Sequence, residues 1–314
     1  MNDNTCQKSA VKPVRSILSV PGHRLAMHQK ASVSDADVIM LDLEDSVPVD
    51  EKAGARQVIV SSLKDLEWGT KTLAVRINAP DTPFCFRDAL EVAGAAGDRI
   101  DYLVLPKVNS AGDIHFLDRL LRGIELENHF DSPMGIEAAI ETAQGLERIS
   151  DISRASRRLC ALSFGVADYT ASLGASLASI SGHGENEAEI YPGHRWHFPL
   201  SRMIMAAKAN KLPAIDAPFG NFRDLEGLKA SAAMAKALGC DGKWAIHPDQ
   251  IPVINQVFSP SAREISRAQT ILKAAEKGGP ARGAVAVEGK MVDQATIRLA
   301  RDLMARARAM NLIT

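Results

Sequence analysis

The sequence predicts a closed (β/α)8 TIM barrel with a small C-terminal helical and hairpin extension. Eight short apolar runs occur within the first 246 residues, and most of the segments between them are helix-like. Strand–helix alternation of this kind is typical of a parallel sheet, and eight repeats are enough to close one into a barrel. The runs are Ser16–Val20, Val38–Leu43, Thr72–Ile77, Tyr102–Leu105, Pro133–Ile140, Leu159–Phe164, Ala214–Ile215 and Lys243–Ile246.

Polar and charged residues stand at or just after the ends of most runs. Barrels of this class place their active sites at the carboxyl ends of the strands, so these side chains are expected around one mouth. They are Pro21, Gly22, His23 and Arg24 after the first run, Asp42, Glu44 and Asp45 at the second, Arg76 and Asn78 at the third, and then Lys107, Glu141, Asp168, Asp216 and His247.

The barrel is expected to occupy residues 1–255 and the extension residues 256–314. The extension reads as a helix over Ser261–Lys277, a Gly-Gly-Pro break, a hairpin and a final helix over Gln294–Met310. A piece of this size has little core of its own, so we expect it to bury apolar positions such as Ile271 and Leu299 against its own barrel or a neighbouring one.

Composition argues for a cytoplasmic protein that binds neither nucleic acid nor membrane. The net charge is -1 and there is no basic run. No apolar segment approaches membrane-spanning length, and Met1–Val14 lacks a secretory apolar core. The four cysteines are scattered without metal-type spacing, which is usual for thiols in a reducing compartment.

Glu141 and Asp168 follow neighbouring predicted strands and are the candidate metal ligands. Two carboxylates at a barrel mouth can hold Mg²⁺, which prefers oxygen ligands and completes its shell with water or substrate. Such an ion could chelate a hydroxy or keto acid and polarise its carbonyl. The alternative is that each carboxylate caps the helix that follows it.

Arg76 could bind a substrate carboxylate through two parallel hydrogen bonds. The alternative, equally favoured by sequence, is an internal ion pair with Glu44 or Asp45 on the neighbouring strand.

Asp42, Glu44 and Asp45 form a dense acidic cluster. We expect them to orient metal-bound waters or to pair with nearby arginines rather than to ligate the ion directly. Lys107 and His247 are also expected beside the site without binding the ion directly. For His247 we favour a structural hydrogen bond over a catalytic role.

Taken together, these motifs resemble the citrate lyase β-subunit-like family of the HpcH/HpaI aldolase superfamily, which includes malyl-CoA and citramalyl-CoA lyases. The matching pieces occur in family order over nearly the whole chain. They are Ser19–Arg24, Leu41–Val47, Val75–Asn78, Leu105–Val108, Ile140–Thr142, Phe164–Tyr169, Ala214–Asp216, Ala245–Gln250 and Lys290–Asp293.

The resemblance implies a lyase that breaks or forms a carbon–carbon bond beside a CoA thioester. It implies Mg²⁺ on Glu141 and Asp168, and the carboxylate of a small keto acid on Arg76 with the backbone amides near Val166 and Ala167. It implies Pro21, Gly22 and Arg24 as further substrate contacts.

The resemblance also implies that Asp293 is the acid/base. The residue would act in the active site of a neighbouring subunit in a homotrimer or hexamer. Asp293 precedes a predicted helix, so it is also a good N-cap, and the two roles are compatible.

Among substrates, the resemblance favours (S)-citramalyl-CoA, cleaved to acetyl-CoA and pyruvate, over malyl-CoA, cleaved to acetyl-CoA and glyoxylate. The sequence reason for this order is the apolar segment Ala217–Phe219, expected at the mouth beside the extra methyl group. The alternatives are a citrate lyase β subunit acting on a carrier-bound citryl thioester and a non-catalytic binding homologue. Segment 175–199 is expected to be a long loop, or a short excursion that leads into a helix over Leu200–Asn210. Its His- and Gly-rich part, 182–197, is individual to this chain and could alter substrate choice.

Overall fold

The computed structural model describes residues 12–175, 195–278, 284–287 and 290–313. Its internal contacts divide the chain into two units, one containing Val14–Gln256 and the other everything from Val257 onward.

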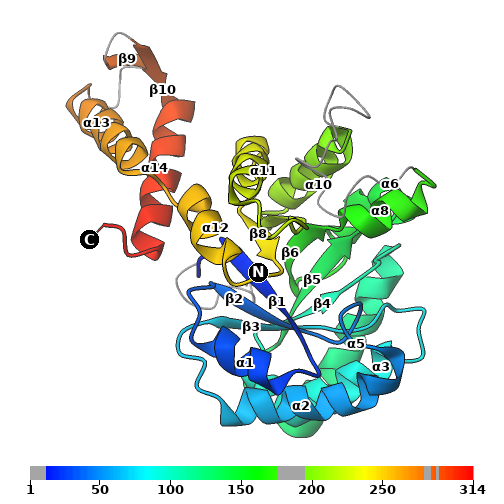
Figure 1. Cartoon of the computed structure of the whole chain (residues 1–314). Coiled ribbons are helices and arrows are strands. Elements are labelled where there is room, and N and C mark those ends of the chain that lie inside the picture. The colour runs from blue at the N-terminus through cyan, green and yellow to red at the C-terminus, as the bar shows by residue number, and fades with distance from the viewer. Residues whose placement is uncertain (1–11, 176–194, 279–283, 288–289, 314) are drawn as a thin grey trace. The chain divides into compact units, whose positions relative to one another are not determined.

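Eight parallel strands close into a barrel, as predicted (Figure 1). Each strand pairs with the next in sequence, and β1 pairs with β8 to complete the ring. The strands are β1 (Ser16–Pro21), β2 (Val38–Asp42), β3 (Thr72–Arg76), β4 (Tyr102–Leu105), β5 (Gly135–Ile140), β6 (Leu159–Phe164), β7 (Ala214–Asp216) and β8 (Gly242–Ala245). The predicted runs therefore mark the strands to within one or two residues.

Helices follow the strands along the chain and lie outside the sheet (Figure 1). The longer ones are α1 (Leu25–Ser32), α2 (Lys52–Asp65), α5 (Ala111–Asn128), α10 (His197–Ala209), α11 (Leu225–Leu238) and α12 (Gln250–Phe258). Shorter pieces are α6 (Ala143–Glu147), α7 (Ile149–Ile152) and α8 (Val166–Ser172). Gly239 ends α11 with a φ of 114°, the left-handed C-cap expected of a glycine at that position.

The region between β3 and β4 contains short helical pieces rather than one regular helix. They are α3 (Cys85–Asp88), a π-helical turn over Ala89–Ala93 and α4 (Gly94–Ala96). Helix α10 begins at His197 rather than Leu200, because Pro199 is tolerated in a first turn, where its missing N–H is not needed. Most of the predicted loop 182–197 lies outside the described residues.

Side chains from the strands fill the interior of the barrel. One buried cluster consists of Ile17, Val38, Met40, Ala74, Tyr102, Val104, Ala161, Ile215 and Trp244. Two charges are buried among such residues as an ion pair, Lys243 Nζ to Asp216 Oδ2 at 2.5 Å, with neither side chain exposed. Since helices cover the outside and side chains fill the inside, the strands are apolar on both faces, which explains why they read as continuous runs.

The C-terminal unit has a small core of its own. Helices α13 (Ala262–Gly278) and α14 (Gln294–Ala309) pack together, and β9 (Ala284–Val287) pairs antiparallel with β10 (Lys290–Asp293). The buried members of the cluster are Ala268, Ile271, Val292, Ile297, Ala300 and Met304. Leu299 faces the other way and is 69% exposed within this chain.

No helix in the described ranges is long and apolar enough to cross a membrane.

Gly22 fixes the turn after β1 against the end of β2. Its amide donates to the Asp42 carbonyl at 2.8 Å. A Cβ at this position would lie 2.5 Å from the same carbonyl oxygen and 2.8 Å from the Ile59 side chain. The close approach of two backbones therefore requires glycine here.

We predict that Gly22→Ala lowers the free energy of unfolding by about 1–3 kcal/mol, because backbone must move to admit the methyl group. Gly54→Ala is the matched control, since nothing lies within 4 Å of a Cβ there. On the exposed face of helix α2, where Gly54 lies, that change should raise the free energy of unfolding by about 0.5–1 kcal/mol. Urea unfolding of both variants is the measurement, and equal effects would contradict the steric argument.

Candidate active site

A buried ion pair joins the carboxyl ends of β2 and β3. Arg76 Nε donates to Asp42 Oδ1 at 2.6 Å, and Nη2 donates to Oδ2 at 2.8 Å. Burial alone would raise the pKa of Asp42, but the charge and hydrogen bonds of Arg76 outweigh it and hold that pKa at about 2. The same carboxylate keeps the pKa of Arg76 above its usual value despite burial. The internal pairing considered for Arg76 is thus present, with Asp42 as its closest partner.

Asp42 also folds the turn that carries Glu44. Its carboxylate accepts hydrogen bonds from the Glu44 amide at 2.9 Å and from the Ser46 amide at 3.1 Å. From α2, the buried Lys52 ammonium donates to the carbonyls of Leu43 at 2.7 Å and Glu44 at 2.9 Å. Sequence reasoning missed Lys52, since no spacing rule distinguishes it from a solvent-exposed lysine in the first turn of a helix.

Glu44 lies between two cations. Its Oε2 is 3.1 Å from Arg76 Nη1, and its Oε1 accepts from Lys107 Nζ at 2.6 Å. Burial raises the pKa of Glu44, and the charge of Arg76 works against that rise. Asp45 stands on the rim, 59% exposed and 3.7 Å from both cations. The acidic cluster is therefore paired with Arg76 and Lys107, one of the two roles expected for it.

Glu141 and Asp168 are brought together beside Lys107. The Lys107 amide donates to Glu141 Oε1 at 2.7 Å, and its ammonium lies 3.4 Å from Asp168 Oδ2. Glu141 is buried, whereas the Asp168 side chain is 36% exposed. Burial raises the pKa of Glu141, and the nearby negative charge of Asp168 raises it further, against the opposing charges of Arg76 and Lys107. The two carboxylates thus share one partly open site.

The donor set fits a hard divalent cation. Glu141 Oε2 is packed so closely over Gly165 that a Cβ there would approach it to 2.2 Å, which holds the carboxylate against the start of α8. No group of three or more His, Cys, Asp and Glu side chains suited to a metal occurs in the described part of the chain. Two carboxylates with the remaining positions left to water and substrate is the usual arrangement for Mg²⁺ and is unlike structural zinc sites.

The other predicted substrate contacts line the same end of the barrel. Pro21 ends β1, Gly22 follows it, and Arg24 is exposed at the start of α1. Val166 and Ala167 form the first turn of α8, where helical amides have no partner within the helix.

His247 follows β8 and stacks on Phe222, with ring centroids 4.8 Å apart. Its Nδ1 accepts from the Asp249 amide at 3.2 Å, which is the kind of structural hydrogen bond expected of it.

Asp293 is the N-cap of α14, as its position suggested. Its Oδ1 accepts from the Thr296 amide at 2.8 Å and from the Thr296 hydroxyl at 2.9 Å. The backbone hydrogen bond from Thr296 lowers the pKa of Asp293, so the carboxylate form is favoured.

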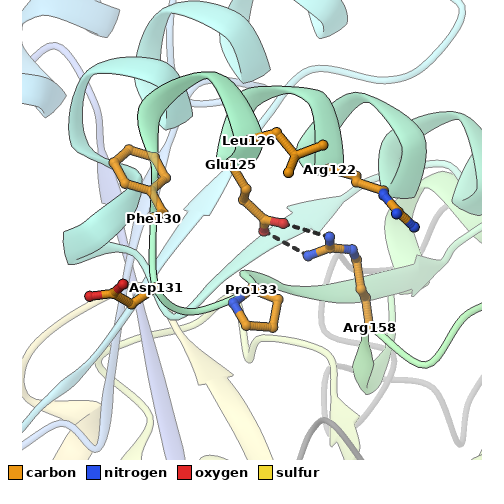
Figure 2. A pocket seen from close by; sticks show the side chains of 7 residues that line it. All are labelled: Arg122, Glu125, Leu126, Phe130, Asp131, Pro133 and Arg158. Carbon is orange, nitrogen blue, oxygen red and sulfur yellow. Dashed lines mark hydrogen bonds and ion pairs between the residues drawn. The ribbon is translucent and has the colours of Figure 1, made fainter.

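A separate shallow cavity of 280 Å³ lies near the amino ends of β5 and β6 (Figure 2). Arg158 reaches into it but is already bound there, with Nη2 2.6 Å from Glu125 Oε2 and Nε 2.7 Å from Asp118 Oδ1. The cavity is smaller than usual ligand sites and sits at the opposite end of the barrel from the carboxylates, so it is not the candidate active site.

The description "HpcH/HpaI aldolase/citrate lyase" applies to a family that matches residues 15–248, which span the barrel from β1 to the turn after β8. The chain belongs to this family. The resemblance inferred from the motifs is therefore confirmed.

The chain is similar to two named lyases and to one solved structure. The chain is 40% identical over 302 residues to an L-malyl-CoA/β-methylmalyl-CoA lyase of Cereibacter sphaeroides, covering 94% of this chain and 95% of the relative. It is 33% identical to a malyl-CoA/β-methylmalyl-CoA/citramalyl-CoA lyase of Chloroflexus aurantiacus, covering 95% and 89%. Among solved structures it is similar to the protein CitE of Mycobacterium tuberculosis in complex with magnesium, acetoacetate and coenzyme A. That match has a TM-score of 0.74 and 31% identity and covers 93% and 97% of the two chains.

We predict that Asp42→Asn lowers the free energy of unfolding at pH 7 by about 3 kcal/mol, because it leaves Arg76 buried without its main partner. Asp45→Asn should change it by less than about 1 kcal/mol, since that pair is exposed. Because the folded pKa of Asp42 lies near 2, below its usual 3.8, its contribution is present above pH 3.8 and is lost as the pH falls toward 2. Chemical unfolding at pH 7 and pH 3 measures both effects, and equal losses for Asp42→Asn and Asp45→Asn would be the contradicting result.

Proposed function

We propose that this chain is a Mg²⁺-dependent carbon–carbon lyase that cleaves a malyl-type 3-hydroxyacyl-CoA thioester into an acyl-CoA and a 2-oxo acid. The observation that carries the proposal is the pair Glu141 and Asp168, placed with Arg76 around one barrel mouth. It is supported by named lyases that align with 94–95% of the chain.

Glu141 and Asp168 are the residues that would hold the ion. When bound, Mg²⁺ supplies a Lewis acid beside the substrate hydroxyl, which makes loss of the hydroxyl proton easier. Glu141 is kept in one orientation by the Lys107 amide and by its contact with Gly165, so the ligand geometry is fixed before substrate arrives.

Arg76 is the proposed anchor for the carboxylate of the 2-oxo acid. A guanidinium has five N–H donors, and Asp42 uses two of them on the Nε and Nη2 edge. The remaining three lie on Nη1 and Nη2. Because Nη1 is also 3.1 Å from Glu44 Oε2, a substrate carboxylate would share these donors with Glu44. Because Asp42 locks the plane of the guanidinium, little entropy is lost when substrate binds. The first-turn amides of Val166 and Ala167 are proposed to hold the same carboxylate from the other side.

Two proton transfers complete the reaction. In cleavage the substrate hydroxyl gives its proton to a base, and the carbon–carbon bond breaks to leave a 2-oxo acid and the enolate of the acyl-CoA. In its protonated form, Asp293 of a neighbouring subunit is proposed to give its proton to that enolate carbon, which leaves Asp293 as the carboxylate. In condensation Asp293 is the base, and its lowered pKa keeps it in the carboxylate form which that direction requires.

The segment Ala217–Phe219 does not supply a reason for placing citramalyl-CoA first. It follows β7 at the carboxyl end of that strand, but Ala217 and Phe219 are fully buried and only Pro218 is partly exposed. The Phe219 carbonyl is also tied to Gln250 at 2.7 Å. With that reason removed, the names of the relatives favour malyl-CoA and β-methylmalyl-CoA, with citramalyl-CoA next.

Two other functions stay as alternatives to be tested. A citrate lyase β subunit would act on a thioester carried by a protein, and a binding homologue would not turn over. The joint presence of Arg76, Glu141, Asp168 and Asp293 favours catalysis, since a binding protein has no use for an acid/base.

Metal dependence is the first prediction. Glu141→Gln and Asp168→Asn should each lower kcat/KM by about a hundredfold or more, because each removes a charged ligand near the developing alkoxide. Chelation should inactivate the parent, and added Mg²⁺ should restore it. Glu147→Gln is the control, a carboxylate that is 80% exposed on α6. Full activity in chelator-treated protein, or in either ligand variant, would exclude the proposed site.

Substrate class is the second prediction. Purified protein should cleave malyl-CoA, β-methylmalyl-CoA and citramalyl-CoA with kcat/KM values within about two orders of magnitude, because one methyl group is discriminated weakly by an apolar pocket. A coupled assay for the released 2-oxo acid measures this. Turnover of only the carrier-bound citryl thioester would identify the citrate lyase alternative, and no turnover of any would identify a binding homologue.

Completion of the site between subunits is the third prediction. Asp293→Ala and Glu141→Ala should each be inactive alone. In a homotrimer or hexamer reassembled from equal amounts, about a quarter of the sites would join an intact metal site to an intact Asp293 of the neighbour. Activity should return to roughly that fraction of the wild-type value. Confirmed mixed oligomers that stay inactive would show that Asp293 acts within its own chain or only caps α14.

A further inference from the structure

Lys107 contacts four carboxylates at the barrel mouth. Its ammonium lies 2.6 Å from Glu44, 3.4 Å from Asp168 and 3.7 Å from Asp45. Its backbone amide donates to the fourth, Glu141, at 2.7 Å. It therefore touches both proposed metal ligands, one through the backbone and the other through the side chain.

The backbone of Lys107 is held in an unfavourable conformation that produces these contacts. Its φ is 50°, in the left-handed region that residues with a Cβ rarely adopt. The bond from its amide to Glu141 and the bond from the Val108 amide to the Ala139 carbonyl fix it there. Strain of this kind persists where the surroundings over-determine a position, and it is common at functional sites.

The surroundings of Lys107 also keep its side chain in the charged ammonium form. Burial works against the ammonium form, but the charge and hydrogen bond of Glu44 raise the pKa of Lys107 above its usual value. Arg76, the other cation paired with Glu44, is turned toward Asp42 by two hydrogen bonds. Lys107 is thus the positive charge directed at Asp168, and it is only 28% exposed, so solvent screens it incompletely.

We propose that Lys107 weakens and thereby sets the affinity of the Glu141–Asp168 pair for a divalent cation, as a fixed positive charge at the edge of that site. The inference rests on the metal-dependent function proposed above. A positive charge a few ångströms from the ion opposes its binding by Coulomb repulsion, and part of the charge of Asp168 is already neutralised.

Glu44 is the positioning residue in this arrangement. By holding the ammonium at 2.6 Å, against 3.4 Å for Asp168, it keeps Lys107 from closing fully onto the metal ligand. Lys52 and Asp42 hold the backbone of Glu44 in turn. The structure therefore assigns opposite effects on metal affinity to two residues that bond each other.

The test is calorimetric titration of MgCl₂ into chelator-treated, full-length protein, which reports binding without activity. Lys107→Met, which removes the charge and keeps the length, should bind Mg²⁺ about tenfold more tightly than wild type. Lys107→Arg should stay within about threefold, because the charge remains. Lys30→Met on α1, an exposed lysine, is the control and should leave the affinity unchanged.

Glu44→Gln provides an independent arm if Lys107→Met fails to fold. It weakens the hold on the Lys107 ammonium and releases that charge toward Asp168, so affinity should fall about tenfold. Unchanged or weaker binding by folded Lys107→Met, or tighter binding by Glu44→Gln, would overturn the inference. A wild-type protein that takes up no Mg²⁺ would instead contradict the metal-dependent function, which separates the two failures.

Discussion

The two hydrogen bonds between Asp42 and Arg76 are the constraint on which the rest of the site depends. Burying either charge alone would cost several kcal/mol, so each is held in place by the need to satisfy the other. Because the two residues end adjacent parallel strands, the pair also fixes the level at which those strands finish. The barrel places Arg76 at the end of β3, and the ion pair with Asp42 fixes the orientation of its guanidinium.

The remaining charged groups follow outward from this pair. Asp42 shapes the turn that carries Glu44, Glu44 holds Lys107, and the Lys107 amide holds Glu141. The first step is a hydrogen bond within the turn after β2, and the other two join different strand ends. A change in one should therefore alter the position of the next, and effects of mutations along this series should not be additive. The site is preorganised by polar bonds rather than by apolar packing.

Much of the fold and of the residue set could be predicted from sequence because both depend on local patterns. Strands buried on two faces must be apolar runs, and the first polar residue after each run marks the mouth; Glu141 and Asp168 were found in this way. The partner of Arg76 could not be chosen, because Asp42, Glu44 and Asp45 lie within one turn and only the fold selects among them.

Other features of the site could not be predicted because they have no compositional signal. They include the bonds from Lys52 to the turn after β2 and the left-handed φ of Lys107. The burial of Phe219 was misjudged because a residue just past a strand end can turn either inward or toward the mouth.

The account places one divalent ion between Glu141 and Asp168 with a 2-oxo acid beside it. The most direct measurement is a crystal structure of the protein soaked with Mn²⁺ and a 2-oxo acid, with the ion located by its anomalous signal. The account predicts an ion about 2.1 Å from a carboxylate oxygen of each residue, with Arg76 in hydrogen-bond contact with the acid. An ion bound elsewhere, or one that contacts neither carboxylate, would contradict it.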